Sequence, residues 1–380
     1  MSAAPPLLPP EGLETAHAGL WDRADAFARE RLPALAEAHE PGPELARAVA
    51  RASREAGLFG LTQPGAQGGT AADALALTLV RERIAATALP ARHHVFGPGP
   101  GMLAAGGPAV AERWLAPLLR GERRTAFAFT DAPGARTVAR RADEGWRLDG
   151  TKGFVTGGAD ADFFTVVASL ADGEGEGAIA LVVDADAPGL VRSAPFRSLD
   201  GTRHVSLTFE GTFVADEAVL GAPGEGLPRA LRQIGDVRLA VAAEACGLMA
   251  FALAHLEARL RAPHRSGAPL GDREGVRLRF ADARIDAFAA RSMLYRTARL
   301  VDAGENTVNE TIATKVFATE AAGRVVDAAL QLEGAGALVE GHPLERLYRE
   351  VRALRFAEGA SDVLRLGLAR GRLELEKGRF

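Results

Sequence analysis

A 35-residue run at positions 228–262, PRALRQIGDVRLAVAAEACGLMAFALAHLEARLRA, constrains the fold more than any other segment. Its apolar residues recur at three- and four-residue spacing, which is the period of an α-helix. The run is longer than a typical globular helix, and around its middle the apolar residues nearly encircle the helix axis. Such a helix has to be buried on several sides, so the sequence predicts a helical bundle or an oligomer core.

The chain divides into three regions according to the spacing of its apolar residues. Helical periodicity runs from Glu14 to about Arg120, short β-type runs such as FFTVVASL and AIALVVDA follow, and helical periodicity returns from about Leu227. We therefore predict an α+β multidomain fold. It has an N-terminal α-helical domain at 1–125, a small middle β-domain at 126–226 and a C-terminal domain at 227–380 that resembles a four-helix bundle. Within the β-domain, the pair Asp149 and Gly150 predicts a tight hairpin.

Composition excludes several classes of protein. With 47% hydrophobic and 25% charged residues the chain is globular, and a formal net charge of −4 argues against a nucleic-acid-binding surface. Cys246 is the only cysteine, which excludes an intrachain disulfide and favours a reducing, cytoplasmic location. No run approaches the roughly 18 apolar residues of a membrane span, so we expect no membrane contact.

Two residue types are notable for their scarcity or spacing. The eight histidines show neither HExxH nor i, i+4 spacing, so the sequence predicts no metal site. Lysine occurs only at Lys152, Lys315 and Lys377 in an arginine-rich chain, which we interpret as the codon bias of a GC-rich genome.

Five short motifs give a more specific indication, because they follow one another in a fixed order over most of the chain. They are GLFGLTQPGAQGGT, GGPAVAERWLAPLLRGERRTAFAFTD, GWRLDGTKGFVTGGADADFF, VADEAVLGAPGEGL and PLERLYREVRALRFAEGASDVL. In this order they resemble the motifs of the acyl-CoA dehydrogenase family of flavoproteins. The resemblance implies FAD as cofactor.

The resemblance also assigns roles to individual residues. It implies that Thr130 contacts the pyrimidine edge of the flavin, that the Thr156 hydroxyl faces flavin N5, and that Phe154 flanks the isoalloxazine ring. Glu358 matches the glutamate that removes the α-proton of an acyl thioester. A carboxylate in this apolar setting is poorly solvated, which raises its pKa toward working pH.

Two residues are expected on the substrate side. Gly359 leaves space for the thioester, and Arg238 orders the long helix near the base. In some relatives the base instead precedes this arginine, but that position here is Val237, so Glu358 is our one candidate for the base.

The match fails at the diphosphate and adenine end of the cofactor. Arg136 stands where the family has small or acidic residues, PHRSGAPLGDREG replaces a segment that reaches a neighbouring subunit's FAD, and QLEGAGA retains Gln331 and Gly334. Either FAD binding is weakened, or Arg136, Arg261 or Arg265 supplies charge to the pyrophosphate. We expect retained FAD, with contacts from Arg136, Arg265, Gln331 and Gly334.

The expected activity is FAD-dependent α,β-dehydrogenation of an acyl thioester, carried on CoA or on acyl carrier protein, within lipid metabolism. Electrons would pass to an electron-transfer flavoprotein or to oxygen. The expected assembly is a homo-oligomer, a dimer or the family's usual homotetramer. Two alternatives stay open: an oxygen-using enzyme similar to acyl-CoA oxidases, and an FAD-poor structural subunit of a hetero-oligomer with a homologous active subunit.

Overall fold

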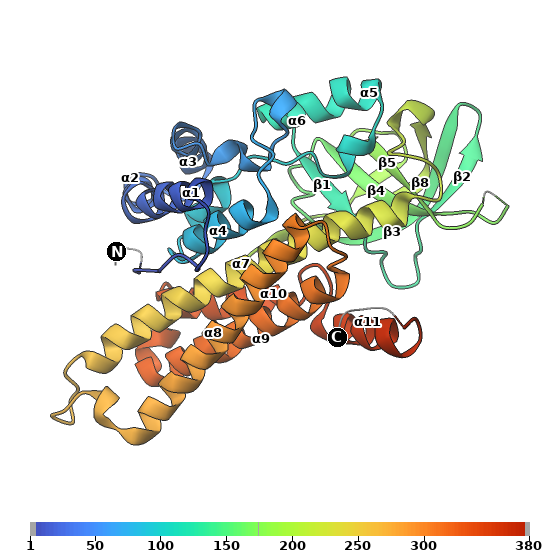
Figure 1. The fold of residues 1–380 in the computed structure, drawn as a ribbon. Helices are drawn as coiled ribbons and strands as arrows, with labels where there is room; N and C mark the ends of the chain where they lie inside the picture. Colours follow the sequence, from blue (N-terminus) through green and yellow to red (C-terminus); the bar gives the residue numbers. More distant parts are fainter. Residues whose placement is uncertain (1–4, 174, 377–380) are drawn as a thin grey trace. The chain divides into compact units, whose positions relative to one another are not determined.

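The computed structural model describes residues 5–173 and 175–376, and most of its helices and strands are labelled in Figure 1. The chain forms two compact units. The helical unit comprises the chain up to Leu61, Ala71–Phe96 and everything from Gly235 onward, and the sheet unit comprises Thr62–Thr70 and Gly97–Ile234. The predicted α+β class, with helices before and after a β-region, is confirmed. The limits of the three predicted domains stay predictions.

The helical unit contains most of the long helices. They are α1 (Thr15–Ala26), the π-helical turn η1 (Phe27–Arg31), α2 (Leu32–Ala38), α3 (Pro43–Glu55), α4 (Ala74–Ala85), α8 (Glu274–Asp302), α9 (Val308–Glu333), α10 (Pro343–Leu354), α11 (Ser361–Leu373) and most of α7 (Gly226–Arg261). Short 3-10 turns also occur along the chain. They are η2 (Phe59–Thr62), η3 (Gly65–Gln67), η4 (Pro90–His94), η5 (Gly101–Ala105), η7 (Asp216–Ala218), η8 (Leu270–Asp272) and η9 (Ala335–Leu338).

Two carboxylates accept hydrogen bonds from the N-terminal backbone N–H groups of α4. Asp73 is its N-cap and accepts a hydrogen bond from the backbone N–H of Ala76 at 2.7 Å. Asp302, at the end of α8, accepts from the N–H groups of Ala74 and Leu75 at 2.7 and 2.9 Å. Three N–H groups without a partner inside the helix are thereby satisfied, and negative charge lies at the positive end of the helix dipole.

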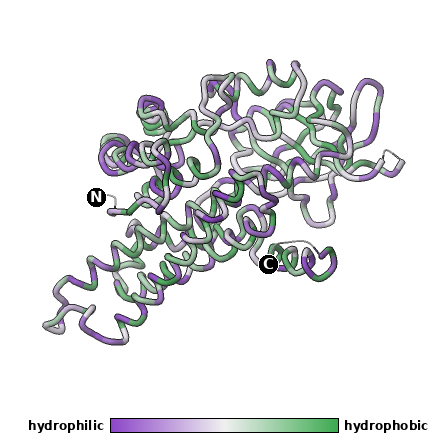
Figure 2. The backbone as a smooth tube through the Cα atoms, in the orientation of Figure 1, coloured by the Kyte–Doolittle hydropathy of each residue, from purple (hydrophilic) through white to green (hydrophobic). Residues whose placement is uncertain are grey.

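Small residues form much of the core of the helical unit. Fully buried alanines on α7, α8 and α9 include Ala242, Ala243, Ala245, Ala252, Ala290, Ala298, Ala318, Ala321 and Ala322. Helices that meet through such residues approach closely: a Cβ added to Gly247 on α7 would lie 2.3 Å from the carbonyl oxygen of Glu82 on α4. This packing explains why apolar residues nearly encircle α7. Figure 2 shows hydrophobic and hydrophilic residues interleaved along the long helices.

The expectation that no run approaches a membrane span is wrong for α7. Among the described residues, α7 is a helix long and apolar enough to cross a membrane, with an 18-residue window of mean hydropathy 1.8. The polar residues Glu244 and His255 hid this run from a search for uninterrupted apolar sequence. Of that window, 61% is buried inside the structure, as in the core helix of a soluble protein, which passes the same test.

The sheet unit is built on one eight-stranded sheet with the order β1-β4-β2-β3-β8-β6, in which β5 pairs with β4 and β7 with β8. The strands are β1 (Thr125–Ala128), β2 (Val138–Ala142), β3 (Gly145–Thr156), β4 (Phe163–Leu170), β5 (Ala178–Asp184), β6 (Leu190–Arg192), β7 (Phe196–Arg197) and β8 (Arg203–Ala215). Nearly every residue of β4 and β5 is buried, which explains their almost continuous apolar sequences.

Short helices complete the core of the sheet unit. They are α5 (Pro108–Val110), the π-helical turn η6 (Ala111–Leu115) and α6 (Ala116–Arg120). Trp114 and Leu118 from these helices share a buried cluster with Phe163 and Phe164 of β4. The Trp114 indole N–H donates to Asp184 at the end of β5, so its one polar group is satisfied.

The predicted hairpin at Asp149 and Gly150 is wrong. Both residues lie inside β3, which pairs with β2 on one side and β8 on the other, and the turn falls earlier, between Ala142 and Gly145. Gly150 has φ 123°, and an added Cβ would lie 2.3 Å from the carbonyl oxygen of Arg136. The glycine therefore permits two backbones to approach closely beside a β-bulge. A β-bulge and a hairpin turn both favour glycine, so the sequence alone did not distinguish them.

Candidate active site

Glu358 lies in the turn between α10 and α11 with φ 53°, in the left-handed region. Phe154, in the third of the five sequence motifs, has φ 52°. A non-glycine residue rarely adopts this conformation, and the strain persists only where surrounding contacts hold it. Two of the predicted site residues are therefore held in strained backbone, which is typical of functional positions.

Two cations hold the Glu358 turn by its carbonyl groups. Lys315 on α9 is fully buried, and its Nζ donates to the carbonyl oxygens of Arg355 at 3.1 Å and Gly359 at 2.9 Å. The Nε of Arg238 on α7 donates to the carbonyl oxygen of Glu358 at 2.9 Å. Because three carbonyls within five residues are hydrogen-bonded, the strained backbone is held in place, and the direction of the Cα–Cβ bond of Glu358 is held with it.

The electrostatics of this turn suit a base. Burial raises the pKa of Glu358 above its ordinary value, although the charges of Arg238 and Lys315 act in the opposite direction. This is the direction predicted from the apolar sequence around Glu358. Burial likewise lowers the pKa of Lys315 to about 8, and the charge of Arg238 acts in the same direction. A carboxyl whose pKa lies nearer neutrality is a stronger proton acceptor at working pH than an ordinary carboxylate.

Gly359 and Arg238 lie beside each other at this turn. Gly359 has φ 111°, and an added Cβ would lie 3.1 Å from Leu364 and 3.5 Å from Nη2 of Arg238. Burial lowers the pKa of Arg238, while the charge of Glu358 opposes the shift. Arg238 thus orders the base through its backbone. The substrate contacts of Arg238 and Gly359 stay predictions.

In the sheet unit, Lys152 fixes the position of Thr130. Its side chain is buried, and Nζ donates to the carbonyl oxygen of Phe129 at 2.7 Å and pairs with Asp131 at 2.6 Å. The N–H of Gly153 donates to the carbonyl oxygen of Thr130 itself at 2.9 Å. The residues on both sides of Thr130 are therefore tied to β3 close to Phe154 and Thr156.

Phe154 presents an exposed ring at a bulge in β3. Its side chain is 68% exposed, and the pairing of β3 with β8 shifts register between Lys152 and Val155. The ring meets Phe196 edge-on, with centroids 5.3 Å apart, and lies 5.8 Å from the ring of His204. An exposed aromatic side chain on strained backbone suits a flat apolar ligand. The hydroxyl of Thr156, two residues on, lies 3.1 Å from Nδ1 of His204.

The predicted diphosphate contacts fall into both units. In the sheet unit, Arg136 is exposed and donates from Nε to the hydroxyl of Ser169 at 2.9 Å. Arg265 is exposed in the α7–α8 connection, Gln331 is exposed near the end of α9, and Gly334 ends α9 with φ 97°. No carboxylate among residues 5–173 and 175–376 forms an ion pair with Arg136 or Arg265, so both charges are available to an anion. The contacts of all four residues with FAD stay predictions.

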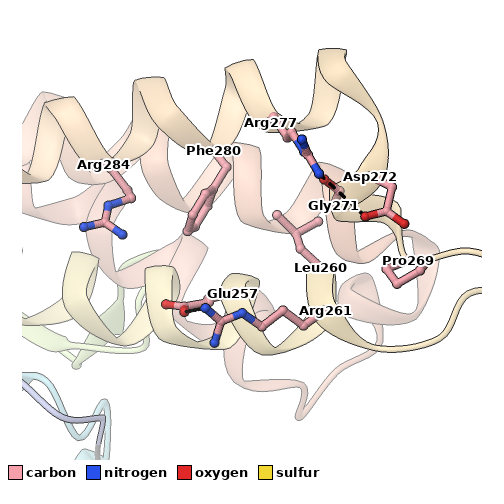
Figure 3. Close-up of a pocket in the computed structure, with 9 residues that line it drawn as sticks. All are labelled: Glu257, Leu260, Arg261, Pro269, Gly271, Asp272, Arg277, Phe280 and Arg284. Carbon is pink, nitrogen blue, oxygen red and sulfur yellow. Dashed lines mark hydrogen bonds and ion pairs between the residues drawn. The ribbon is translucent and has the colours of Figure 1, made fainter.

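The third arginine proposed for the pyrophosphate, Arg261, lies at a pocket of about 380 Å³ near the end of α7 (Figure 3). Arg261 pairs with Glu257 at 2.7 Å, so its charge is already compensated. The remaining lining residues are Leu260, Pro269, Gly271, Asp272, Arg277, Phe280 and Arg284. At about 1.5 Å per helical residue, this pocket lies roughly 30 Å along α7 from Arg238, so it is separate from the Glu358 turn.

One group of metal-capable side chains converges in the described part of the chain, although the histidine spacing predicted none. Ligand atoms of His255, Glu333 and His342 lie within 4.8 Å of one another. Nδ1 of His342 accepts a hydrogen bond from the N–H of Leu344, whereas the second nitrogen of a metal-bound histidine normally donates. Glu333 also pairs with Arg259 at 3.5 Å. His342 therefore has the hydrogen bonding of a helix cap, and Glu333 forms ion pairs. The absence of a metal site stays a prediction.

Sequence reasoning missed Lys152, Lys315 and His204. The signal for the two lysines was present, because a lysine in an arginine-rich chain marks a position where a compact ammonium fits and a planar guanidinium does not. Both lysines are buried against backbone carbonyls. Codon bias stays our interpretation of their scarcity, but it left the roles of these two positions unexamined. Lys377 lies outside the described residues. No sequence pattern singled out His204, because Thr156, the partner that connects it to the candidate site, is 48 residues away in the chain.

Three family models match the chain in order: the N-terminal domain of acyl-CoA dehydrogenase at residues 14–122, the middle domain at 128–212 and the C-terminal domain at 224–373. An acyl-CoA dehydrogenase of Bacillus subtilis is 28% identical over 354 residues, covering 90% of this chain and 93% of its own. A 3-(aryl)acrylate reductase of Clostridium sporogenes is 27% identical over 356 residues, covering 90% and 94%.

Among solved structures, a probable acyl-CoA dehydrogenase from Mycobacterium abscessus superimposes with a TM-score of 0.80 at 25% identity, covering 94% of this chain and 98% of that one. Together the matches define the class of protein, an FAD-dependent oxidoreductase that acts on CH–CH groups. The chain belongs to the acyl-CoA dehydrogenase family.

Proposed function

We propose that the protein catalyses the α,β-dehydrogenation of an acyl thioester to the 2-enoyl thioester, with Glu358 as the base. The observation that carries the proposal is the clamped turn: a half-buried carboxyl of raised pKa, held on strained backbone by Lys315 and Arg238. A carboxylate that serves only as a solvated surface group requires none of these features.

The residues of the sheet unit fit the isoalloxazine ring of FAD. The exposed ring of Phe154 offers an apolar surface, and the hydroxyls of Thr130 and Thr156 offer polar contacts at anchored positions. Arg136 and Arg265 would supply positive charge for the diphosphate, with Gln331 and Gly334 as further contacts. This supports retained FAD despite the altered motifs.

In the proposed reaction, a carboxylate oxygen of Glu358 accepts the α-proton while the Cβ–H bond breaks and the Cα–Cβ double bond forms. FAD held by Phe154, Thr130 and Thr156 would supply the two-electron acceptor for the β-hydrogen, which leaves as hydride. Gly359 leaves the thioester room to reach Glu358, and Arg238 and Lys315 hold the base in place as the proton transfers. The similarity to a relative named 3-(aryl)acrylate reductase makes the reverse direction, with Glu358 delivering the proton to the α-carbon, a variant of the same proposal.

Carrier, electron acceptor and assembly belong to the proposal as well. We propose acyl-CoA or acyl carrier protein as carrier and an electron-transfer flavoprotein or oxygen as acceptor. We further propose a role in lipid metabolism, a cytoplasmic location, no contact with nucleic acid or membrane, and a homo-oligomer, as a dimer or homotetramer. An oxidase-like reaction would release peroxide without an added acceptor. An FAD-poor subunit of a hetero-oligomer is the alternative that the altered diphosphate residues favour, although a purely structural subunit has no use for a clamped, strained Glu358.

The test begins with the visible spectrum of the purified protein and the identification of any cofactor that heat releases. A panel of saturated acyl thioesters is then mixed anaerobically with wild-type protein, Glu358→Gln and the control Asp362→Asn, a side chain 93% exposed on α11. Flavin bleaching should fall by orders of magnitude in Glu358→Gln alone, since the change removes the base and keeps the shape. Equal bleaching in the two variants would refute Glu358 as base. A protein that stays colourless with added FAD would support the structural subunit.

A further inference from the structure

The hydroxyl of Thr156 is the first member of a hydrogen-bonded chain inside the sheet unit. Thr156 Oγ1 lies 3.1 Å from Nδ1 of His204, and Nε2 of His204 lies 3.1 Å from Oγ of Ser198. The hydroxyl of Ser198 donates to Asp200. Thr202 donates to the same carboxylate from its hydroxyl at 2.7 Å and from its N–H at 3.1 Å. Thr156 and His204 face each other across paired strands, β3 and β8.

The donor and acceptor at each link can be assigned from the far end of the chain. Asp200 accepts only, because these hydrogen bonds lower its pKa against the effect of burial and keep it ionised. Ser198 has one proton, and its two acceptors within the turn, Asp200 and the carbonyl oxygen of Thr202, both require that proton. Ser198 must therefore accept from Nε2–H of His204.

The proton assignment at Ser198 determines the hydrogen-bond roles of His204 and Thr156, at the other end of the chain of hydrogen bonds. Neutral histidine carries a proton on one ring nitrogen, so Nδ1 of His204 is bare and accepts the proton of the Thr156 hydroxyl. Thr156 is exposed. Toward any outside partner it then offers only the lone pairs of its oxygen.

We infer that His204, oriented by Ser198 and Asp200, makes Thr156 a hydrogen-bond acceptor that favours the reduced form of the cofactor. The inference rests on the proposed function, in which the Thr156 hydroxyl faces flavin N5. N5 accepts hydrogen bonds in oxidised flavin and carries a hydrogen in reduced flavin, so an acceptor at this position stabilises the reduced form more than the oxidised form. His204 is a positioning residue: it acts on the cofactor only through Thr156.

The first test measures the midpoint potential of bound FAD in the holoenzyme. His204→Phe keeps a planar ring and removes both nitrogens, so Thr156 regains a free proton. We expect binding of reduced relative to oxidised flavin to weaken about tenfold, which for a two-electron couple lowers the potential by about 30 mV. Ser198→Ala, which frees His204 to change tautomer, should shift the potential in the same direction by a smaller amount.

A double-mutant cycle separates this role from a general structural one. Thr156→Val should lower the potential as well, and adding His204→Phe to Thr156→Val should change it no further, because the histidine acts through the lost hydroxyl. Thr208→Val is the matched control: it also breaks a threonine contact between β3 and β8, the 3.2 Å pair of Thr208 with Thr151, and should leave the potential unchanged. Additive shifts, an unchanged potential in His204→Phe or a rise would overturn the inference.

A second measurement does not require the cofactor. The ¹⁵N chemical shifts of the His204 ring in protein freed of flavin should report a proton on Nε2 and a bare Nδ1. A proton on Nδ1 would overturn the inference, even if FAD binds and the enzyme turns over. If the protein binds no FAD at all, the proposed function fails and the inference fails with it. A bound flavin with an unshifted potential refutes the inference alone.

Discussion

The side-chain nitrogen of Lys315 lies 2.9 Å from the carbonyl oxygen of Gly359, the residue after the proposed base, and the lysine side chain is fully buried. Lysine normally keeps its ammonium group in water, and burying it is costly unless the charge is hydrogen-bonded or paired. Here the carbonyl of Arg355 is a second acceptor, and the charge of Glu358 favours the protonated form of Lys315. Lys315 therefore fixes the backbone of Glu358 and places a positive charge near its carboxylate.

Replacing Lys315 by methionine keeps most of the side-chain volume and removes both hydrogen bonds. Two carbonyls in the turn then lose a partner, and we expect the free energy of unfolding to fall by about 2–4 kcal/mol. Urea unfolding followed by circular dichroism measures this change. Glu320→Gln, which alters another charged side chain on α9, serves as the control and should cost less than about 1 kcal/mol. Equal losses in the two variants would contradict the clamp.

The pH dependence of flavin reduction follows from the same geometry. Only the carboxylate form of Glu358 accepts a proton, so the rate should rise with pH through a pKa that burial has raised above the ordinary glutamate value. Removal of the positive charge of Lys315 disfavours the carboxylate. The midpoint of the profile should therefore move to higher pH in Lys315→Met. Anaerobic stopped-flow mixing from about pH 5 to about pH 9 measures both profiles. A midpoint that stays in place, or moves to lower pH, would show that Lys315 does not act on the charge of Glu358.

The elements of this fold were predictable where the signal is local. The period of apolar residues gave α7 within two residues of its ends, and continuous apolar runs gave β4 and β5. The hairpin at Asp149 and Gly150 failed because a glycine with positive φ serves a turn and a bulge equally well. Which segments form one compact unit is decided by contacts between distant parts of the chain, and periodicity carries no information about them.

In the candidate site, too, the residues with a local sequence signal were predicted, whereas most of those that depend on long-range contacts were not. Glu358, Phe154 and Thr156 were found through short motifs, and two of them are held in strained backbone. Arg238, which bonds to the carbonyl oxygen of Glu358, was also expected near the base, but Lys315 and His204 were not found. Lys315 is 44 positions from Gly359, and His204 is 48 positions from Thr156. Short motifs identified the residues that are proposed to contact a ligand. The residues that position these contact residues depend on how helices and strands pack.

Arg136 provides a test of how the altered diphosphate motif binds FAD. Its guanidinium is held by Ser169 and forms no ion pair with a described carboxylate. If it contacts the diphosphate, Arg136→Ala should weaken FAD binding about tenfold, or about 1.4 kcal/mol. Titration of flavin fluorescence with apoprotein gives the dissociation constant. Arg140→Ala, an exposed arginine on neighbouring β2, is the control for charge alone. Equal affinities in the two variants would remove Arg136 from the FAD site.

A buried polar cluster in the helical unit gives the last prediction. Glu82 is fully buried on α4; it accepts a hydrogen bond from the hydroxyl of Tyr295, and another from Nε of Arg291 at 2.8 Å. Tyr295→Phe removes one donor from a buried carboxylate and leaves the ring in place, so unfolding should become easier by about 1.5–3 kcal/mol. The other tyrosine of the chain, Tyr348, is 42% exposed, and Tyr348→Phe should change stability by less than about 0.5 kcal/mol. Urea midpoints of the two variants measure the difference. A loss in Tyr295→Phe no larger than that in Tyr348→Phe would mean that Arg291 alone satisfies Glu82.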